Sequence, residues 1–229
     1  MKKAGVDLYI GEAELLGSSK GVTKTNVRVC RPSGCVELDS FHVCIATGSR
    51  AHRPTELSQG VPITFSKGRV VDSTEISSIT DLPRSVVIIG GGVIAVEYAT
   101  VLAELKVGVT LICSETSFLP FVESDLRRSL KRRLKKSRVL IVHLNIKEII
   151  EIEDEEGGKG SVKVVMENDP LRPQIRRVFT VDTVVYSGGR DANSEGMGLE
   201  NVNILTKKYV SFVEVNSVRL YLVFYLYCH

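Results

Sequence analysis

Short apolar segments recur along the chain and predict a fold of alternating strands and helices. Residues 85–90 contain four consecutive β-branched residues, a pattern typical of a central parallel strand buried on both faces. Three glycines follow, and residues 93–105 then predict a helix. Its inward face is built from apolar residues at helical spacing: Ala95, Tyr98, Ala99 and Leu102. Residues 109–113 predict the next strand, so the three elements form a βαβ unit.

Further strands are predicted on both sides of this unit. Single strands are expected at residues 8–16, 42–46, 139–144 and 183–186. A hairpin is expected because two alternating runs are joined by Arg31-Pro32-Ser33-Gly34, which carries turn residues. An antiparallel meander is expected from residues 146–152, 161–166 and 177–181. The fold class is therefore α/β, a Rossmann-type parallel sheet with an antiparallel meander.

Two helical segments complete the prediction. Residues 72–79 favour a short helix or turn, with Asp72 or Ser73 as its cap. Residues 123–137 predict a very basic helix that starts with acidic residues, an order that complements the helix dipole. Its buried stripe is expected from leucines repeating every four residues: Leu126, Leu130 and Leu134. No aromatic residues interleave its basic face, so we expect a solvated surface and no nucleic-acid partner.

Composition narrows the class of protein. The 229 residues are 43% hydrophobic and 25% charged, which is ordinary for a globular protein and unlike a disordered one. No run of about 20 apolar residues exists, so no membrane partner is expected. Five cysteines, an odd count, argue against a disulfide scaffold and favour a reducing, cytoplasmic location. The four histidines show no metal-ligand spacing, and no metal site is expected.

The candidate chemistry lies in the glycine motif Gly90-x-Gly92-x-x-Ala95, between the predicted strand and helix. Gly90 permits a tight turn, Gly92 lets the backbone approach a pyrophosphate, and Ala95 is small enough for helix–strand packing. The phosphates are expected at the helix N-terminus, where free N–H groups favour an anion. The whole segment is the candidate cofactor-binding turn: Gly90, Gly91, Gly92, Val93, Ile94 and Ala95. The alternative is a glycine-rich turn that binds nothing.

A ribose-reading group is expected roughly 20 residues after these glycines. Cys113 stands at the predicted strand end, and Glu115 lies two residues later. A carboxylate there accepts hydrogen bonds from a ribose 2′-hydroxyl and repels a 2′-phosphate. No Arg or Lys occurs from Cys113 to Asp125, which favours NAD(H) over NADP(H). Glu115 as an ordinary solvated loop acid remains the alternative.

The order of three segments resembles the pyridine nucleotide-disulfide oxidoreductase superfamily of flavoproteins. These segments are Ala46-Thr47-Gly48-Ser49-Arg50, the glycine motif with Glu97-Tyr98-Ala99, and Gly188-Gly189-Arg190. Within the superfamily the chain resembles the soluble, Si-specific pyridine nucleotide transhydrogenases first and dihydrolipoamide dehydrogenases next. The resemblance implies FAD and a nicotinamide dinucleotide as cofactors, and a homodimeric family.

The resemblance also implies roles for individual residues. Thr47, Gly48 and Ser49 would lie near the flavin, and Ala13 would contact FAD through its backbone. Two further residues border the nicotinamide site, namely Glu97, facing the nicotinamide, and Gly189. No side chain is assigned a catalytic role.

The implied domains are a partial FAD-binding domain at residues 1–50, an NAD(P)-binding domain at 51–210 and a divergent apolar tail at 211–229. The family's FAD glycine turn and its dimer domain have no counterpart in the sequence, so we expect a fragment. Two functions follow: hydride transfer between NAD(P)H and flavin, or non-catalytic NAD binding.

The pair Cys30 and Cys35 has the spacing of the family's redox disulfide. In the family that motif sits on a helix, whereas here it spans a predicted hairpin turn. We therefore expect two ordinary thiols on facing strands.

Overall fold

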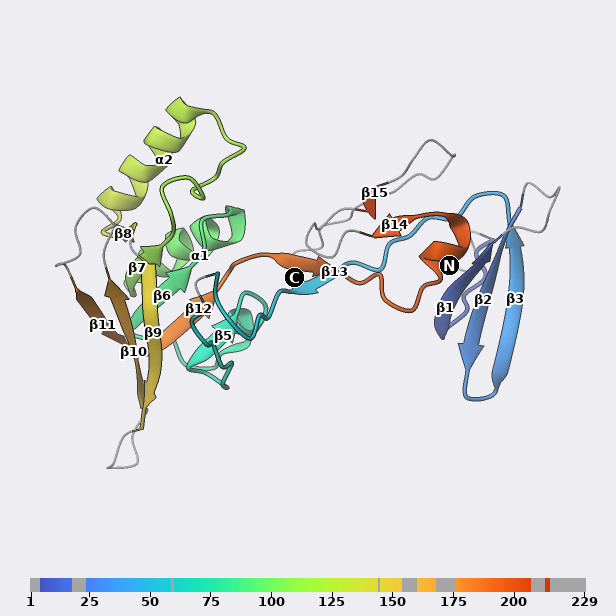
Figure 1. Cartoon of the computed structure of the whole chain (residues 1–229), viewed down its shortest axis with the longest axis horizontal. Coiled ribbons are helices and arrows are strands. Elements are labelled where there is room, and N and C mark those ends of the chain that lie inside the picture. The colour runs from blue at the N-terminus through green and yellow to red at the C-terminus, as the bar shows by residue number, and fades with distance from the viewer. Residues whose placement is uncertain are drawn as a thin grey trace. The chain divides into compact units, whose positions relative to one another are not determined.

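The computed structural model describes residues 5–17, 24–58, 60–143, 145–153, 160–167, 176–206 and 213–214. They form two compact units. The larger unit is built from residues 51–189, and the smaller unit from the described parts of 1–50 and 190–229. Residues 190–206 lie in the same unit as the described residues before Ala51, and the division into an FAD-binding domain and an NAD(P)-binding domain stays a prediction. The elements are drawn in Figure 1.

The larger unit contains a five-stranded parallel sheet in the order β5-β12-β6-β7-β8. Its strands are β5 (Val70–Asp72), β6 (Ser85–Ile89), β7 (Gly108–Ile112), β8 (Leu140–Val142) and β12 (Thr183–Tyr186). Helix α1 (Val93–Glu104) connects β6 to β7, and α2 (Ser124–Lys136) connects β7 to β8. The predicted βαβ unit is therefore confirmed.

Alternate residues of β6 face opposite sides of this sheet, as the two-residue period of a strand requires. Val86 and Ile88 pack in one core with α1 and α2. Val87 and Ile89 pack in a second core with an antiparallel meander. The meander strands are β9 (Asn145–Ile152), β10 (Ser161–Glu167) and β11 (Arg177–Val181). Burial on both faces explains why residues 86–89 of β6 are all apolar, and the predicted fold class is confirmed.

The smaller unit holds a three-stranded antiparallel sheet in the order β1-β2-β3. Its strands are β1 (Glu12–Gly17), β2 (Thr25–Arg31) and β3 (Gly34–Ser40). Leu15 packs against Leu199, the first residue of the 3₁₀ helix η3 (Leu199–Val202), and against Ile204, which follows that helix. The remaining strands are β4 (Ser49–Ala51), β13 (Arg190–Ala192), β14 (Leu205–Thr206) and β15 (Val213–Glu214). β4 pairs with β13, and β14 pairs with β15.

Two local predictions are corrected and one is confirmed. Residues 42–46 form no strand, because their apolar side chains pack partly into the smaller unit's core without a neighbouring strand to pair with among the described residues. The short helix or turn predicted at residues 72–79 is confirmed as the 3₁₀ helix η2 (Glu75–Ser78), and Asp72 accepts the amide N–H groups of Thr74 and Glu75 as expected. On α2, Leu134 is buried but Leu126 is 60% exposed, so the leucine stripe covers only the helix's C-terminal part.

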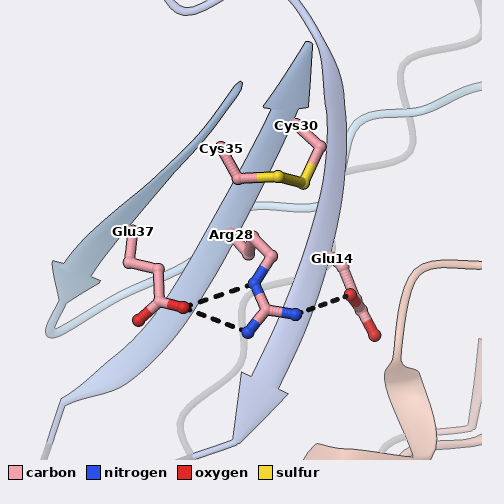
Figure 2. The surroundings of a disulfide bond; sticks show 5 residues. All are labelled: Glu14, Arg28, Cys30, Cys35 and Glu37. Carbon is pink, nitrogen blue, oxygen red and sulfur yellow. Dashed lines mark hydrogen bonds and ion pairs between the residues drawn. A yellow bond between two sulfur atoms is a disulfide. The ribbon is translucent and has the colours of Figure 1, made fainter. Parts of the chain in front are cut away.

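The hairpin prediction is confirmed, but the prediction of two free thiols on it is wrong. Cys30 and Cys35 are directly opposite each other in the β2–β3 ladder and are joined by a disulfide (Figure 2). Facing positions on adjacent antiparallel strands bring Cβ atoms close enough for this bond. Spacing alone did not reveal the register that places the two sulfur atoms together.

Two further observations concern the chain as a whole. Within the described residues, no helix combines the length and apolar character needed to cross a bilayer. The predicted apolar tail, residues 211–229, lies outside the described residues except for 213–214.

Because the parallel sheet is buried on both faces, shortening one of its buried side chains should lower the free energy of unfolding. Leu111 on β7 is fully buried, so Leu111→Ala should lower the free energy of unfolding by about 2–5 kcal/mol through lost contacts and a cavity. The matched substitution Leu126→Ala, at the exposed position on α2, should change it by less than about 0.5 kcal/mol. Urea unfolding followed by circular dichroism measures both, and equal losses would contradict the observed packing.

Candidate dinucleotide-binding site

The turn after β6 requires glycine at its first position. Gly90 has a φ of +139°, and a Cβ there would collide with the carbonyl oxygen of Ser187. Its amide donates to the Ile112 carbonyl oxygen at 2.9 Å, which ties the turn to the neighbouring strand β7. Only a residue without a side chain satisfies both the dihedral angle and the close approach.

The next two glycines differ from each other in their surroundings. A Cβ on Gly91 would collide with the carbonyl oxygen of Ser117, and the Gly91 carbonyl accepts the Leu119 amide at 2.8 Å. A Cβ on Gly92, in contrast, would meet no heavy atom within 4 Å, and its φ of −80° is open to any residue. Packing within the chain explains Gly90 and Gly91, but it leaves the space beside Gly92 unfilled.

Helix α1 begins at this open space. Gly92 is its N-cap residue, no side chain caps this end, and the first turn holds no acidic residue. The first amide N–H groups of a helix have no carbonyl partner within the helix. Val93 and Ile94 are exposed and half-buried respectively, whereas Ala95 is fully buried in the core beneath the turn. Glu97 is exposed in the second turn of α1.

The end of β12 lies beside the end of β6. The Ser187 amide donates to the Ile89 carbonyl oxygen at 2.8 Å, so the two chain segments leave the sheet together. The Ser187 Oγ is buried and has no hydrogen-bond partner among the described residues. Gly189 follows with a φ of +142°, and its carbonyl oxygen accepts the His52 amide at 3.1 Å. A buried hydroxyl without a partner is uncommon and calls for an explanation.

Glu115 follows the end of β7 and is held by two basic side chains. Its Oε1 accepts from Lys131 Nζ of α2 at 2.5 Å, and its Oε2 lies 2.9 Å from His143 Nε2, just after β8. The other ring nitrogen, Nδ1, lies 2.8 Å from the Cys113 carbonyl oxygen. The hydrogen bond from Lys131 is the main cause that lowers the pKa of Glu115, with further favourable charge from His143 and Arg127. This carboxylate is therefore ionised and oriented.

Cys113 occupies the other position considered for ribose recognition. Its side chain is buried, and burial raises the pKa of the thiol to about 11. A neutral thiol is a weak hydrogen-bonding group. Of the two competing positions, Glu115 therefore presents the stronger acceptor.

The residues implied for flavin binding lie in the smaller unit. Thr47 Oγ1 donates to the Asn193 carbonyl oxygen at 2.7 Å, and the Asn193 amide donates to the Gly48 carbonyl oxygen at 3.1 Å. Ser49 is contacted by Arg190, whose Nε donates to Ser49 Oγ at 2.7 Å. Ala13 is exposed on β1, opposite Val29. Thr47, Gly48 and Ser49 are thus hydrogen-bonded to the segment of residues 190–193. Ala13 lies on β1, in the three-stranded sheet.

Comparison with known proteins assigns a family to this arrangement. The family model described as pyridine nucleotide-disulphide oxidoreductase matches residues 2–217. The chain belongs to this family. The ordered segments that suggested the resemblance all lie within the matched residues.

Individual relatives agree with this membership. The chain is 33% identical over 200 residues to a soluble pyridine nucleotide transhydrogenase of Pseudomonas paraeruginosa, covering 87% of this chain and 38% of the relative. A relative of the same description from Pseudomonas putida is 30% identical over 200 residues, with the same coverage. The chain spans about two fifths of the length of these relatives.

Solved structures show the same fold. The HOCl-induced flavoprotein disulfide reductase RclA of Escherichia coli matches with a TM-score of 0.65 and 25% identity. That match covers 88% of this chain and 40% of RclA. LpdA of Mycobacterium tuberculosis matches with a TM-score of 0.67 at 22% identity, covering 89% of this chain and 41% of LpdA.

A nicotinamide dinucleotide of the kind bound by pyridine nucleotide oxidoreductases fits the residues at the carboxyl edge of the parallel sheet. The open space at Gly92 would admit a pyrophosphate, and the uncapped start of α1 offers amide donors to it. Carboxyl ends of parallel strands are also where α/β sheets bind ligands.

FAD, in contrast, does not fit the described part of the smaller unit by itself. Its elements within residues 5–17, 24–50 and 190–206 are strands and one 3₁₀ helix, so these ranges offer no α-helix N-terminus to a second pyrophosphate. The polar groups of Thr47 and Ser49 are already bonded to residues 190–193. No reaction step is therefore assigned to FAD on these residues.

A cavity elsewhere in the larger unit is a distinct feature. It has a volume of about 700 Å³ and is lined by residues that precede β5, β6 and β12, among them Arg69, Arg84 and Asp182. It therefore lies at the amino edge of the sheet, opposite the glycine turn. Among the described residues, no group of three or more His, Cys, Asp or Glu side chains is arranged to bind a metal.

Sequence reasoning missed the basic partners of Glu115. The absence of Arg and Lys between Cys113 and Asp125 was the basis for favouring NAD(H) over NADP(H), yet Lys131 and His143 reach Glu115 from α2 and from the end of β8. Sheet order was the available signal, because β8 neighbours β7 and both end at the same edge.

The buried thiol predicts selective alkylation. At pH 8, iodoacetamide should modify the exposed Cys44 and leave Cys113 intact, because the thiol of Cys113 has a pKa of about 11 and stays protonated. Peptide mass mapping after timed alkylation measures both sites. In denaturant the two cysteines should react at similar rates, and equal rates in the folded chain would contradict the burial of Cys113.

Proposed function

We propose that this chain binds a nicotinamide dinucleotide, NAD(H) or NADP(H), on the turn from Gly90 to Ala95. The observation that carries the proposal is the uncapped start of α1 beside the open space at Gly92. In this role the chain holds and orients the dinucleotide, which carries the hydride. Family membership supports this assignment.

Each residue of the turn has a separate task in this proposal. Gly90 and Gly91 shape the backbone, Gly92 leaves room for the pyrophosphate, and the amides that open α1 donate to its oxygens. Ala95 keeps the helix close to the sheet. Glu97 and Gly189 border the nicotinamide half, as the resemblance implies. The dinucleotide itself supplies the hydride, and the chain supplies binding and orientation.

We propose further that Glu115 favours NAD(H) over NADP(H). Its carboxylate is ionised and oriented by Lys131 and His143, so it is ready to accept hydrogen bonds from a ribose hydroxyl. Because the pKa of Glu115 is lowered, this acceptor is charged at neutral pH and is lost only on acidification through that lowered pKa. A 2′-phosphate would have to displace or neutralise this carboxylate.

The transhydrogenase names of the relatives support hydride transfer between pyridine nucleotides through flavin as the reaction of the whole protein. The alternative is a non-catalytic dinucleotide-binding module, favoured by the smaller unit's lack of an FAD pyrophosphate site within its described residues.

Flavin retained after incubation with FAD and desalting, seen as a visible absorption band, would favour the first function. A colourless protein that still binds NADH would favour the second. The cytoplasmic location remains a prediction.

The open space at Gly92 predicts a binding variant that still folds. Gly92→Val should weaken NADH binding about tenfold or more, equivalent to about 1.4 kcal/mol or more, because its side chain would occupy the pyrophosphate position. Titration of NADH fluorescence measures the affinity, and thermal unfolding checks the fold.

The matched control is Gly108→Val at the start of β7. Gly108 has no positive φ, and its added Cβ would approach nothing closer than 3.5 Å. This variant should therefore keep its NADH affinity. Unchanged NADH affinity in a folded Gly92→Val protein would rule out the turn as the binding site.

The charge arrangement at Glu115 predicts a change in cofactor preference. Glu115→Gln should shift the affinity ratio towards NADPH by about tenfold, because Lys131 and His143 would then face the ribose without a competing anion. Parallel titrations with NADH and NADPH measure the ratio. The control Glu148→Gln, an exposed acid on β9, should leave the ratio unchanged. An unaltered ratio in Glu115→Gln would show that the carboxylate does not face the ribose.

A further inference from the structure

The disulfide between Cys30 and Cys35 lies on the β2–β3 hairpin of the smaller unit, whereas the proposed dinucleotide-binding turn belongs to the larger unit. The two residues are opposite each other in the ladder, one pair before the turn closes at Arg31 and Gly34. Residues 31–35 are all exposed, and Cys30 is half-buried. The bond is therefore presented at the exposed end of a hairpin.

The face of the sheet that carries this disulfide is polar. Arg28, two residues before Cys30, bonds to Glu37 on β3 at 3.1 Å and pairs with Glu14 on β1 at 3.8 Å (Figure 2). The intervening residue Val29 points to the other face and is buried. Since successive side chains of a strand alternate between faces, the disulfide lies on the solvent side and outside the core.

The hairpin does not depend on the disulfide for its alignment. The β2–β3 ladder runs from the pair Thr25–Ser40 to the pair Arg31–Gly34, and the Arg28 ion pairs join all three strands on the same face. The bond encloses only the short turn between residues five apart, so it removes less chain entropy than a disulfide across a longer loop would. After reduction, the ladder would hold the two thiols facing each other and favour their reoxidation.

We propose that Cys30 and Cys35 form a reversible thiol–disulfide exchange site for low-molecular-weight thiols such as glutathione. A thiolate attacks the Sγ of the exposed Cys35, a mixed disulfide forms there, and Cys30 leaves as a thiolate. A second thiolate attacks the sulfur of the bound small thiol and releases Cys35 as a thiolate. The balance is one protein disulfide and two thiols converted into two protein thiols and one small-molecule disulfide.

This site differs in place and partner from the proposed dinucleotide function. It lies in the smaller unit, on strands rather than on a helix, and its reductant is a soluble thiol rather than a flavin. Loss of NADH binding would leave the exchange chemistry intact, so the two proposals fail separately.

The full chain, purified in air, tests the proposal in reduced and oxidised glutathione mixtures without denaturant. Free thiols are alkylated at each mixture, and peptide mass mapping reports Cys30 and Cys35, with the exposed free Cys44 as an internal reference. We expect both hairpin cysteines to be protected initially, to become alkylated together in reducing mixtures, and to regain protection on reoxidation. Circular dichroism should stay unchanged throughout.

Two single variants test the direction of attack. Cys30→Ser leaves the exposed Cys35, which should form a mixed disulfide with oxidised glutathione faster than the half-buried Cys30 left by Cys35→Ser. Peptide mass mapping without reductant measures the adduct at each cysteine separately from that at Cys44, and equal rates or a reversed order would contradict the assigned attack on Cys35.

Three results of the redox titration would overturn the proposal: alkylation of both cysteines in the untreated chain, a bond that opens only after denaturation, or loss of strand signal on reduction. The last two would identify the disulfide as a structural brace.

Discussion

The close approach of two strand ends is the constraint on which the proposed site depends. β6 and β12 leave the sheet side by side, and the Ser187 carbonyl occupies the space where a side chain on Gly90 would lie. Glycine therefore allows the chain to turn at once, so that α1 starts at the sheet edge. If this turn were wider, the helix amides would lie farther from the ends of β7 and β12. The positions of Gly92 and Ser187 relative to each other follow from this contact.

Much of the larger unit could be predicted because its signals are local. Four consecutive β-branched residues define β6, three glycines end it, and small residues at helical spacing define the face of α1 that packs on it. The β2–β3 hairpin could also be predicted, since turn residues separate two runs in which apolar and polar residues alternate. Residues 42–46 show the limit of this reasoning: an apolar run can fill a core without joining a sheet. A strand needs both buried side chains and a neighbouring strand to pair with, and an apolar run in the sequence indicates only the burial.

The features that the sequence did not reveal are those that depend on register or on distant contacts. Lys131 reaches Glu115 from sixteen residues away, and His143 approaches from the neighbouring strand end. Cys30 and Cys35 bond because they are an aligned pair, which the turn length determines. Leu126 continues the leucine spacing but lies beyond the part of α2 that meets the core. The charged residues of the loop after β7 therefore describe the proposed cofactor-facing surface only in part. Lys131 and His143 come to this surface from other segments, because β8 lies next to β7 in the sheet.

The smaller unit is assembled from two stretches of chain separated by residues 51–189. At about 5–20 residues per second, a ribosome needs roughly 7–28 s to make the intervening segment. The hairpin strands can pair within microseconds, yet Leu15 gains Leu199 and Ile204 only after that interval. During synthesis the larger unit is thus complete before the smaller one, and the nascent three-stranded sheet shows an uncovered apolar face to the cell. That interval is when a chaperone would have most to bind and when mispairing with another nascent chain is most favourable.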